Sequence, residues 1–356
     1  MKAEDTVVIR NIFTMLAYAY QALDLREYEE VGAEEFDNAL DLLGAIYVRG
    51  LSQQVRRGLD QGYVERTEDL GCARGRIDVR ASAGPRLRQR LQLRCTYSEL
   101  CRDTELNRLI KCVGLLFLRS PELRASTKAD VRRLLPYLSE VGDIATAEAR
   151  RIRPSYTRVN KSYQLLVAVC HFALRGLLPD KSGEGAGFAK VLDARELNQL
   201  YEKFLLEYFR RHHAAEVSAK ASRVAWDTEP GATLPSFLPG MNTDVTLTGK
   251  GERAGRTLII DAKCYGRILT SHHGKEMISP GNVYQLFTYV NNADTNHDGS
   301  VSGMLLYALT DERDLPFEAG EREWTAGPNR FEVRTVDLGL PWEELAKQLD
   351  DVLAVV

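Results

Sequence analysis

The sequence has no apolar run long enough to cross a bilayer at its start. The uncharged stretch at residues 11–23 is shorter than the ~20 apolar residues that a spanning helix requires. The region also lacks the basic start and the small-residue cleavage site of a secretory signal peptide. We therefore expect a cytoplasmic protein that does not act at a membrane.

Paired cysteines are missing as well. The six cysteines include no CxxC pair and follow no regular spacing, whereas zinc sites and disulfide frameworks both need such spacing. Several of them lie within apolar helical patterns, where a free thiol behaves as a small hydrophobic group. This usage fits a reducing cytoplasm. The cysteines are Cys72, Cys95, Cys101, Cys112, Cys170 and Cys264.

The chain also lacks an excess of positive charge. Its formal net charge is -3, so the chain as a whole is not a basic nucleic-acid binder. The balance conceals a local excess, because residues 74–94 contain seven arginines and one acid. Such a run either neutralises phosphates, pairs with acids of a partner protein, or forms a solvated surface. The arginines are Arg74, Arg76, Arg80, Arg86, Arg88, Arg90 and Arg94.

The sequence that is present is typical of a globular protein with two domains. Hydrophobic residues make up 44% and charged residues 27% of the 356 positions, and this length favours two domains. The first half is mostly helical by its apolar spacing, with extended segments at 62–80 and 90–97. A glycine-rich stretch at 181–187 predicts a linker, which places the domain boundary close to residue 185.

The second half alternates helices and strands. We expect helices at 194–213, 282–290 and 342–353, and strands at 221–226, 243–248, 257–261 and 302–309. This order favours an α+β or α/β domain, in which helices flank a central mixed sheet. The fold class is therefore a mostly helical N-terminal region followed by a mixed α/β domain.

The residues that point to chemistry lie on two consecutive strands of this domain. An apolar strand ends in Asp261-Ala262-Lys263, and strand alternation places Asp261 and Lys263 on one face. If the preceding strand pairs with it as a hairpin, Asp244 approaches Asp261. Two carboxylates and the free Ala262 carbonyl are oxygen ligands that suit Mg²⁺. The lysine is then placed to orient or deprotonate a water molecule, as in phosphodiester hydrolysis. The alternative is an ordinary surface salt-bridge set.

The same residues resemble the PD-(D/E)xK nuclease motif, with Thr243 in place of the usual proline. Residues 282–289 resemble the glutamine-bearing helix that follows the motif in many of these nucleases. Further segments, in the same order along the chain, are similar to the McrC family, the nuclease subunits of McrBC modification-dependent restriction systems. Those segments are residues 9–19, 71–77, 103–111 and 200–208.

The resemblance implies a division of labour between two regions. Residues 1–185 would bind and activate a hexameric McrB-like AAA+ GTPase, and residues 186–356 would be a PD-(D/E)xK endonuclease that cuts double-stranded DNA. Recognition of methylcytosine would belong to the partner. The implied cofactor is Mg²⁺, for which Mn²⁺ can substitute, and the chain itself would bind no nucleotide. A faint P-loop echo at residues 176–182 lacks the second glycine before its lysine.

The resemblance also assigns roles to individual residues. Asp244 and Asp261 would be metal ligands, joined by the Ala262 carbonyl. Lys263 would be the catalytic lysine, and Gln285 would support the site from the next helix. An additional acid from the first helix would be Glu202, with Glu207 as the alternative. In the first region, Arg74 and Arg76 are the arginines that could reach a partner's nucleotide site in trans.

Two other functions remain open at this stage. One is a non-cleaving activator or adaptor of an AAA+ GTPase, whose nuclease-like domain would be inactive. The intact set of Asp244, Asp261 and Lys263 argues against it. The other is a stand-alone nuclease without an NTPase partner. The long, arginine-rich first half argues against that, because a minimal nuclease does not need it.

Overall fold

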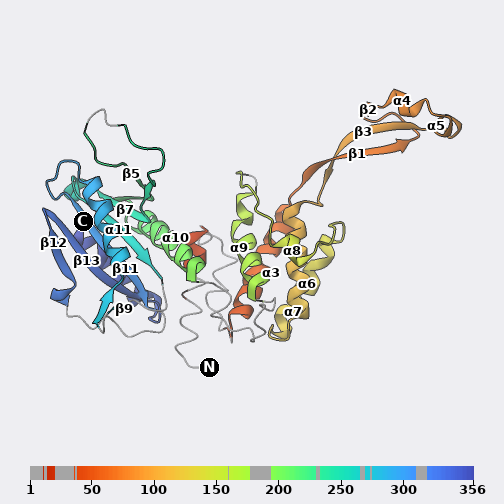
Figure 1. Cartoon of the computed structure of the whole chain (residues 1–356). Helices are drawn as coiled ribbons and strands as arrows, with labels where there is room; N and C mark the ends of the chain where they lie inside the picture. The colour runs from red at the N-terminus through yellow and green to blue at the C-terminus, as the bar shows by residue number, and fades with distance from the viewer. Residues whose placement is uncertain are drawn as a thin grey trace. The chain divides into compact units, whose positions relative to one another are not determined.

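The computed structural model describes residues 11, 14–20, 36, 38–158, 160–176, 194–229, 233–264, 269–272, 275–309 and 319–356. The chain forms two compact units, one of residues 43–186 and the other of residues 1–42 together with 187–356. Figure 1 shows the elements of both units, coloured along the chain. Among the described helices, none is long and apolar enough to cross a membrane.

The unit of residues 43–186 contains a helical body and a β arm that projects from it (Figure 1). In the body, the buried Tyr47 donates a hydrogen bond from its hydroxyl to the Ile110 carbonyl, at 2.8 Å, and packs edge-on against Phe117. The helices are α3 (Ala39–Arg57), α6 (Glu105–Arg119), α7 (Ala125–Leu134), α8 (Thr146–Ala149) and α9 (Gln164–Gly176).

The arm is an antiparallel hairpin with a short third strand. Strand β1 (Gly62–Leu70) pairs along its whole length with β3 (Leu93–Cys101), and β2 (Arg76–Ile77) pairs with the other edge of β3. Two short helices, α4 (Val79–Ser82) and α5 (Pro85–Gln89), lie at the far end of the arm (Figure 1). The extended character that the sequence predicts for residues 62–80 and 90–97 is therefore confirmed for β1, β2 and the first part of β3, while α4 begins at the end of the first segment.

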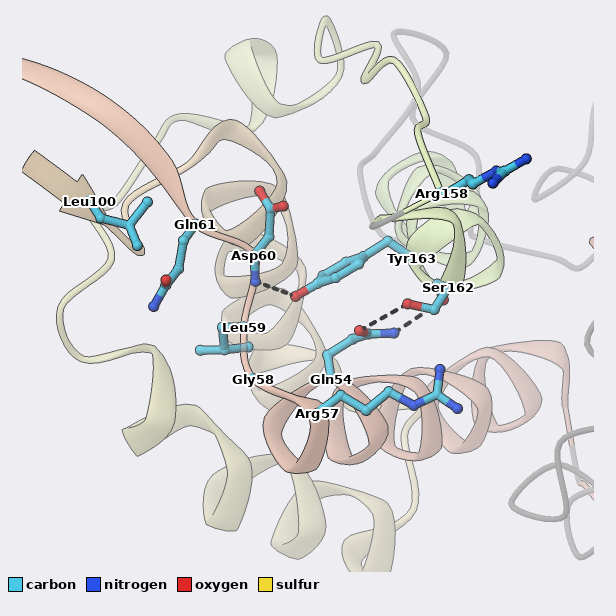
Figure 2. A pocket seen from close by; sticks show the side chains of 10 residues that line it. All are labelled: Gln54, Arg57, Gly58, Leu59, Asp60, Gln61, Leu100, Arg158, Ser162 and Tyr163. Atoms are coloured by element: carbon cyan, nitrogen blue, oxygen red, sulfur yellow. Dashed lines mark hydrogen bonds between the residues drawn. The ribbon is translucent and has the colours of Figure 1, made fainter. Parts of the chain in front are cut away.

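The base of the arm is clamped to the helical body through the backbone of Asp60. The Tyr163 hydroxyl accepts a hydrogen bond from the Asp60 N–H at 2.6 Å (Figure 2). On the other side, the fully buried Asn107 donates to the carbonyls of Asp60 and Arg102, at 2.9 and 2.7 Å. The two ends of the arm, at Asp60 and Arg102, are thus both hydrogen-bonded to side chains of the helical body. A pocket of about 560 Å³ lies beside this clamp.

The other unit is built on a six-stranded mixed sheet in the order β12-β13-β11-β8-β7-β4. The strands β8, β11 and β13 run parallel, and the pairs β4·β7, β7·β8 and β12·β13 are antiparallel. The mixed sheet with flanking helices is the fold class that the sequence predicts. The strands are β4 (Val217–Lys220), β7 (Val245–Gly249), β8 (Thr257–Lys263), β11 (Val301–Leu309), β12 (Glu323–Ala326) and β13 (Asn329–Asp337).

Helices and two small hairpins complete this unit. Helix α11 packs on one face of the sheet, where Leu286 and Val290 meet Ile259 and Leu305 in a buried cluster. The helices are α10 (Ala194–His212), α11 (Pro280–Ala293) and α12 (Trp342–Asp350). The hairpins are β5 (Arg223–Val224) with β6 (Met241–Asn242), and β9 (Leu269–His272) with β10 (Lys275–Ile278).

The start of the chain belongs to this second unit, whereas the sequence suggested a single region over residues 1–185. The buried Asn11 donates its side-chain amide to the carbonyl of Leu338 at 2.6 Å. The Tyr18 ring lies 5.5 Å from Phe204 of α10 and 5.3 Å from Trp342 of α12, between ring centroids. The contacts of these side chains thus explain why the N-terminal residues group with the sheet.

Candidate active site

The candidate site forms where β7 begins and β8 ends. The two strands pair antiparallel, with Val245 opposite Ile260, which meets the condition that the sequence analysis set for Asp244 to approach Asp261. Asp244 directly precedes β7, and its carboxylate Oδ2 accepts a hydrogen bond from the Ala262 N–H at 2.9 Å. The paired residues of β7 and β8 end at Val245 and Ile260. Beyond them, the Ala262 N–H therefore bonds to the Asp244 side chain instead of to a backbone carbonyl of β7. This places Asp244 beside the charged end of β8.

Asp261 and Lys263 lie side by side on one face of β8. Lys263 Nζ donates to Asp261 Oδ1 at 2.9 Å and lies 2.9 Å from Oδ2. Asp261 is 1% and Lys263 6% exposed. Within the described part of the chain, Asp261 Oδ2 has no hydrogen-bond partner of acceptable geometry. A buried ion pair costs desolvation energy that its own attraction does not reliably offset, so this pair is more simply explained by function than by stability.

Burial makes the negative charges of this site unfavourable. Burial, together with the neighbouring Asp244 carboxyl, raises the pKa of Asp261 to about 6 against the opposing effect of the Lys263 ammonium. Burial also raises the pKa of Asp244, opposed mainly by the hydrogen bond from the Ala262 N–H. Raised carboxyl pKa values in one place are typical of functional sites. A bound cation would favour the charged forms again.

A third acid, Glu202 of α10, belongs to the same cluster. Burial, together with the Asp244 carboxyl, raises the pKa of Glu202 to about 7 against the lowering effect of Lys263. Glu207, the alternative in the sequence, instead forms an ion pair with Arg210 along the helix, at 2.7 Å. The pKa of Glu202 thus responds to the charged residues of the site.

Asn198, also on α10, was not foreseen from the sequence. Its side-chain N–H donates to Glu202 Oε1 at 2.5 Å, and its Oδ1 accepts from the Cys264 N–H at 2.7 Å. The four-residue spacing of Asn198 and Glu202 on a helix was a usable signal for the first bond. The second bond joins residues that are 66 positions apart, and local spacing carries no information on it.

The side chains of the site cannot by themselves fill the coordination shell of a metal ion. Among the described residues, no group of three or more His, Cys, Asp and Glu side chains is arranged to hold a metal. The N–H and C=O of one strand residue face the same strand edge, so the Ala262 carbonyl faces the side of Asp244. Two carboxylates and this carbonyl fit Mg²⁺, which usually keeps several waters and binds through one or two carboxylates.

Thr243 stands where the resembled motif has proline, and it uses groups that proline lacks. Its N–H donates to the Ser222 carbonyl at 2.9 Å, and its hydroxyl accepts from the Ser222 N–H at 3.0 Å. The same hydroxyl lies 2.8 Å from the Thr246 hydroxyl in a buried hydrogen bond. The substitution therefore keeps the backbone before Asp244 anchored by hydrogen bonds instead of by a rigid ring.

Gln285 lies on α11, which covers the sheet face that Ile259 shares with Asp261 by strand alternation. Its side-chain N–H donates to the Tyr289 hydroxyl at 2.9 Å, one turn along the helix. The structure therefore places α11 over the sheet face that carries Asp261, but it gives the Gln285 amide a partner within the helix. A role in supporting the site stays a prediction.

Arg74 and Arg76 lie in the other unit, near the third strand of the arm. The Arg74 guanidinium is over the Tyr97 ring, 3.9 Å from its centroid, and lies 3.5 Å from Glu99 Oε1. Gly75 between them has φ of +65°, and a Cβ there would lie 2.4 Å from the Thr96 carbonyl. Arg76 is exposed in β2 and forms no ion pair with any residue in the described ranges. Arg76 is thus the freer of the two cations.

Comparisons with known proteins show which family and fold this chain resembles. Residues 2–308 match the family described as "McrBC 5-methylcytosine restriction system component". A protein of Escherichia coli strain K12, described as "Type IV methyl-directed restriction enzyme EcoKMcrBC", is 27% identical to this chain over 98% of each sequence. A solved structure, described as a "Refined half-complex from tetradecameric assembly of Thermococcus gammatolerans McrB AAA+ hexamers with bound McrC", is 18% identical. It covers 99% of this chain and 78% of the other, with a TM-score of 0.54, and shows a shared fold.

Proposed function

Because the chain belongs to the McrBC 5-methylcytosine restriction system component family, we propose that it is the DNA endonuclease subunit of such a system. The observation that carries this proposal is the convergence of charged groups at the end of β8. A carboxylate and a lysine, both almost fully buried, are paired there at 2.9 Å. Asp244 and Glu202 add two further acids, and burial raises the pKa of each.

The proposed reaction is hydrolysis of a DNA phosphodiester bond with Mg²⁺ as cofactor. Asp244, Asp261 and the Ala262 carbonyl would hold the ion, and Mn²⁺ would serve in its place. When bound, the ion would polarise a phosphoryl oxygen and make the attacking water easier to deprotonate. Asp261 holds the ammonium of Lys263 in place. Lys263 then positions the attacking water and offsets the charge that develops on the phosphate.

The unit of residues 43–186 is proposed to bind and activate an AAA+ GTPase partner. The Thermococcus gammatolerans structure is described as McrB AAA+ hexamers with bound McrC, and we extend that type of partner to this chain. The exposed arm supplies cationic side chains for such a contact. Of its arginines, Arg76 is the better candidate for reaching a nucleotide site in trans, because Arg74 is already engaged with Tyr97 and Glu99.

The proposal is tested by cleavage of methylated and unmethylated plasmid DNA. The purified chain is assayed with Mg²⁺, alone and together with the partner GTPase and GTP. We expect cutting of methylated DNA in the complete mixture and its loss, by at least about 100-fold, in Lys263→Ala. Lys347→Ala is the matched control, because Lys347 is an exposed lysine of α12 in the same unit.

The remaining outcomes discriminate between the alternatives. Equal cutting by the chain alone would identify a stand-alone nuclease. Stimulated GTP hydrolysis without any cutting would identify a non-cleaving activator. Assaying Arg76→Ala beside Arg74→Ala tests the arm separately. A fall in GTP hydrolysis confined to Arg76→Ala supports its role in trans, and no change in either variant contradicts it.

A further inference from the structure

Asn198 joins two parts of the candidate site through one rigid amide group. It lies on α10 one turn before Glu202, and its N–H donates to Glu202 Oε1 at 2.5 Å. Its carbonyl oxygen accepts from the Cys264 N–H at 2.7 Å. Cys264 is the residue after Lys263, at the point where β8 ends. The side chain therefore contacts an acid of the site and the strand that carries the lysine.

We propose that Asn198 is a positioning residue that sets the Glu202 carboxylate against the metal-binding end of β8. This inference rests on the proposed nuclease function. The amide is planar, so two opposed hydrogen bonds fix its rotation. The Cys264 N–H fixes the position of Asn198 Oδ1. The direction of the Asn198 N–H bond is then also fixed, and it points to Glu202 Oε1. The other oxygen, Oε2, is left to receive a metal-bound water or the ion itself.

The bond geometry explains why a free glutamate would perform less well. A glutamate side chain has three rotatable bonds, and fixing them on binding costs conformational entropy. Asn198 restricts these bonds before the ion arrives, and it does so relative to the strand end that carries Lys263. Groups that hydrogen-bond to metal ligands commonly change metal affinity or activity by about 10–100-fold when removed. Asn198 is expected to act in this range.

The competing explanation is that Asn198 only satisfies the Cys264 N–H where α10 meets β8. Asn292 provides a matched control for this role. It is also a partly buried helical asparagine, with its N–H donated to the Thr288 carbonyl of the preceding turn and its oxygen accepting from the Asp227 N–H, both at 2.8 Å. Neither of these bonds involves an acid of the site. Asn292→Ala therefore measures only the effect of losing the backbone hydrogen bonds of a helical asparagine.

The experiment is a double-mutant cycle on the full chain, with Mn²⁺ as the probe ion. Calorimetric titration with Mn²⁺ is made on wild type, Asn198→Ala, Glu202→Ala, the double variant and Asn292→Ala. The Mg²⁺ concentration that gives half-maximal cleavage is measured in the complete mixture with partner and GTP. We expect Asn198→Ala to weaken Mn²⁺ binding and to raise the Mg²⁺ requirement by about 10-fold. In the Glu202→Ala background, adding Asn198→Ala should change neither Mn²⁺ binding nor the Mg²⁺ requirement any further.

The outcomes separate this inference from the function on which it rests. Additive losses in the cycle, or Asn198→Ala behaving as Asn292→Ala, would overturn the positioning role while the nuclease assignment stands. Wild type that neither binds Mn²⁺ nor cuts DNA would overturn both. If Asn198→Ala does not fold, Asn198→Asp replaces it, since its carboxylate still accepts from the Cys264 N–H but cannot donate to Glu202. Reduced cleavage by this variant supports the proposal, and wild-type cleavage contradicts it.

Discussion

Without metal, the protein should lose stability as the pH rises through neutrality because of Asp261. Burial raises the pKa of this carboxyl to about 6, from an ordinary value of 3.8. A raised pKa in the folded state means that the folded protein binds the proton more tightly than the unfolded chain does. The stabilising contribution is therefore complete below pH 3.8 and is lost as the pH rises through about 6.

The size of this effect follows from the two pKa values. A difference of about two pKa units corresponds to about 3 kcal/mol of unfolding free energy when it is fully expressed. Between pH 5 and pH 8 about 1 kcal/mol is lost, because the unfolded carboxyl is already ionised at pH 5. In a unit of this size 1 kcal/mol moves Tm by about 2–4 °C. The Tm should therefore fall by about 2–4 °C across this range.

Thermal unfolding with a chelator present, from pH 5 to pH 8, checks the reasoning in wild type and Asp261→Asn. The variant lacks the titrating carboxyl, so its Tm should depend less on pH by this amount. Asp298→Asn is the control, because hydrogen bonds from Ser300 lower the pKa of the exposed Asp298 and place its titration below the range. Mg²⁺ should raise the Tm of wild type more at pH 8 than at pH 5. An Asp261→Asn variant with the wild-type pH dependence would refute the argument.

Two further substitutions test the local structure. Thr243→Val removes the buried hydroxyl that accepts from the Ser222 N–H. It should therefore lower the unfolding free energy by about 1–3 kcal/mol in urea titrations, and an unchanged midpoint would contradict the anchoring role. Gly75→Ala places a Cβ 2.4 Å from the Thr96 carbonyl at a φ of +65°. It should thus speed hydrogen exchange in β2 and β3 without altering exchange in the sheet of the other unit, and equal exchange in the arm would show that the turn tolerates a side chain.

The sequence was most informative where one short-range rule determines the structure. Strand alternation predicted that Asp261 and Lys263 share a face, and the apolar run of β8 located them. The sequence did not indicate β13, although it is a long strand of the sheet. Its alternation is obscured by charged side chains, including Glu332, which is buried at 5% exposure. The predicted strand at 221–226 is only the two-residue β5, and the edge strand β4 lies just before it.

Contacts between distant segments account for what could not be predicted. Asn198 supports the site only because α10 lies against the end of β8, and no local pattern reports that docking. The grouping of Tyr18 with α10 and α12 is another example. An aromatic residue in an amphipathic stretch is predicted to be buried, but the sequence does not show which helix it packs against. The roles of Gln285 and Arg76 stay predictions, because their importance depends on DNA and on the partner.

The bond between Asn11 and Leu338 has a consequence for synthesis of the protein. These two residues are 327 positions apart, so the ribosome makes one long before the other. The unit of residues 43–186 is continuous in the chain, and we expect it to fold as it emerges. The sheet that supports the acids is completed only by β13 and α12, which are translated after its other strands. A nascent chain would thus complete the unit proposed to bind the partner before it completes the site proposed to cut DNA.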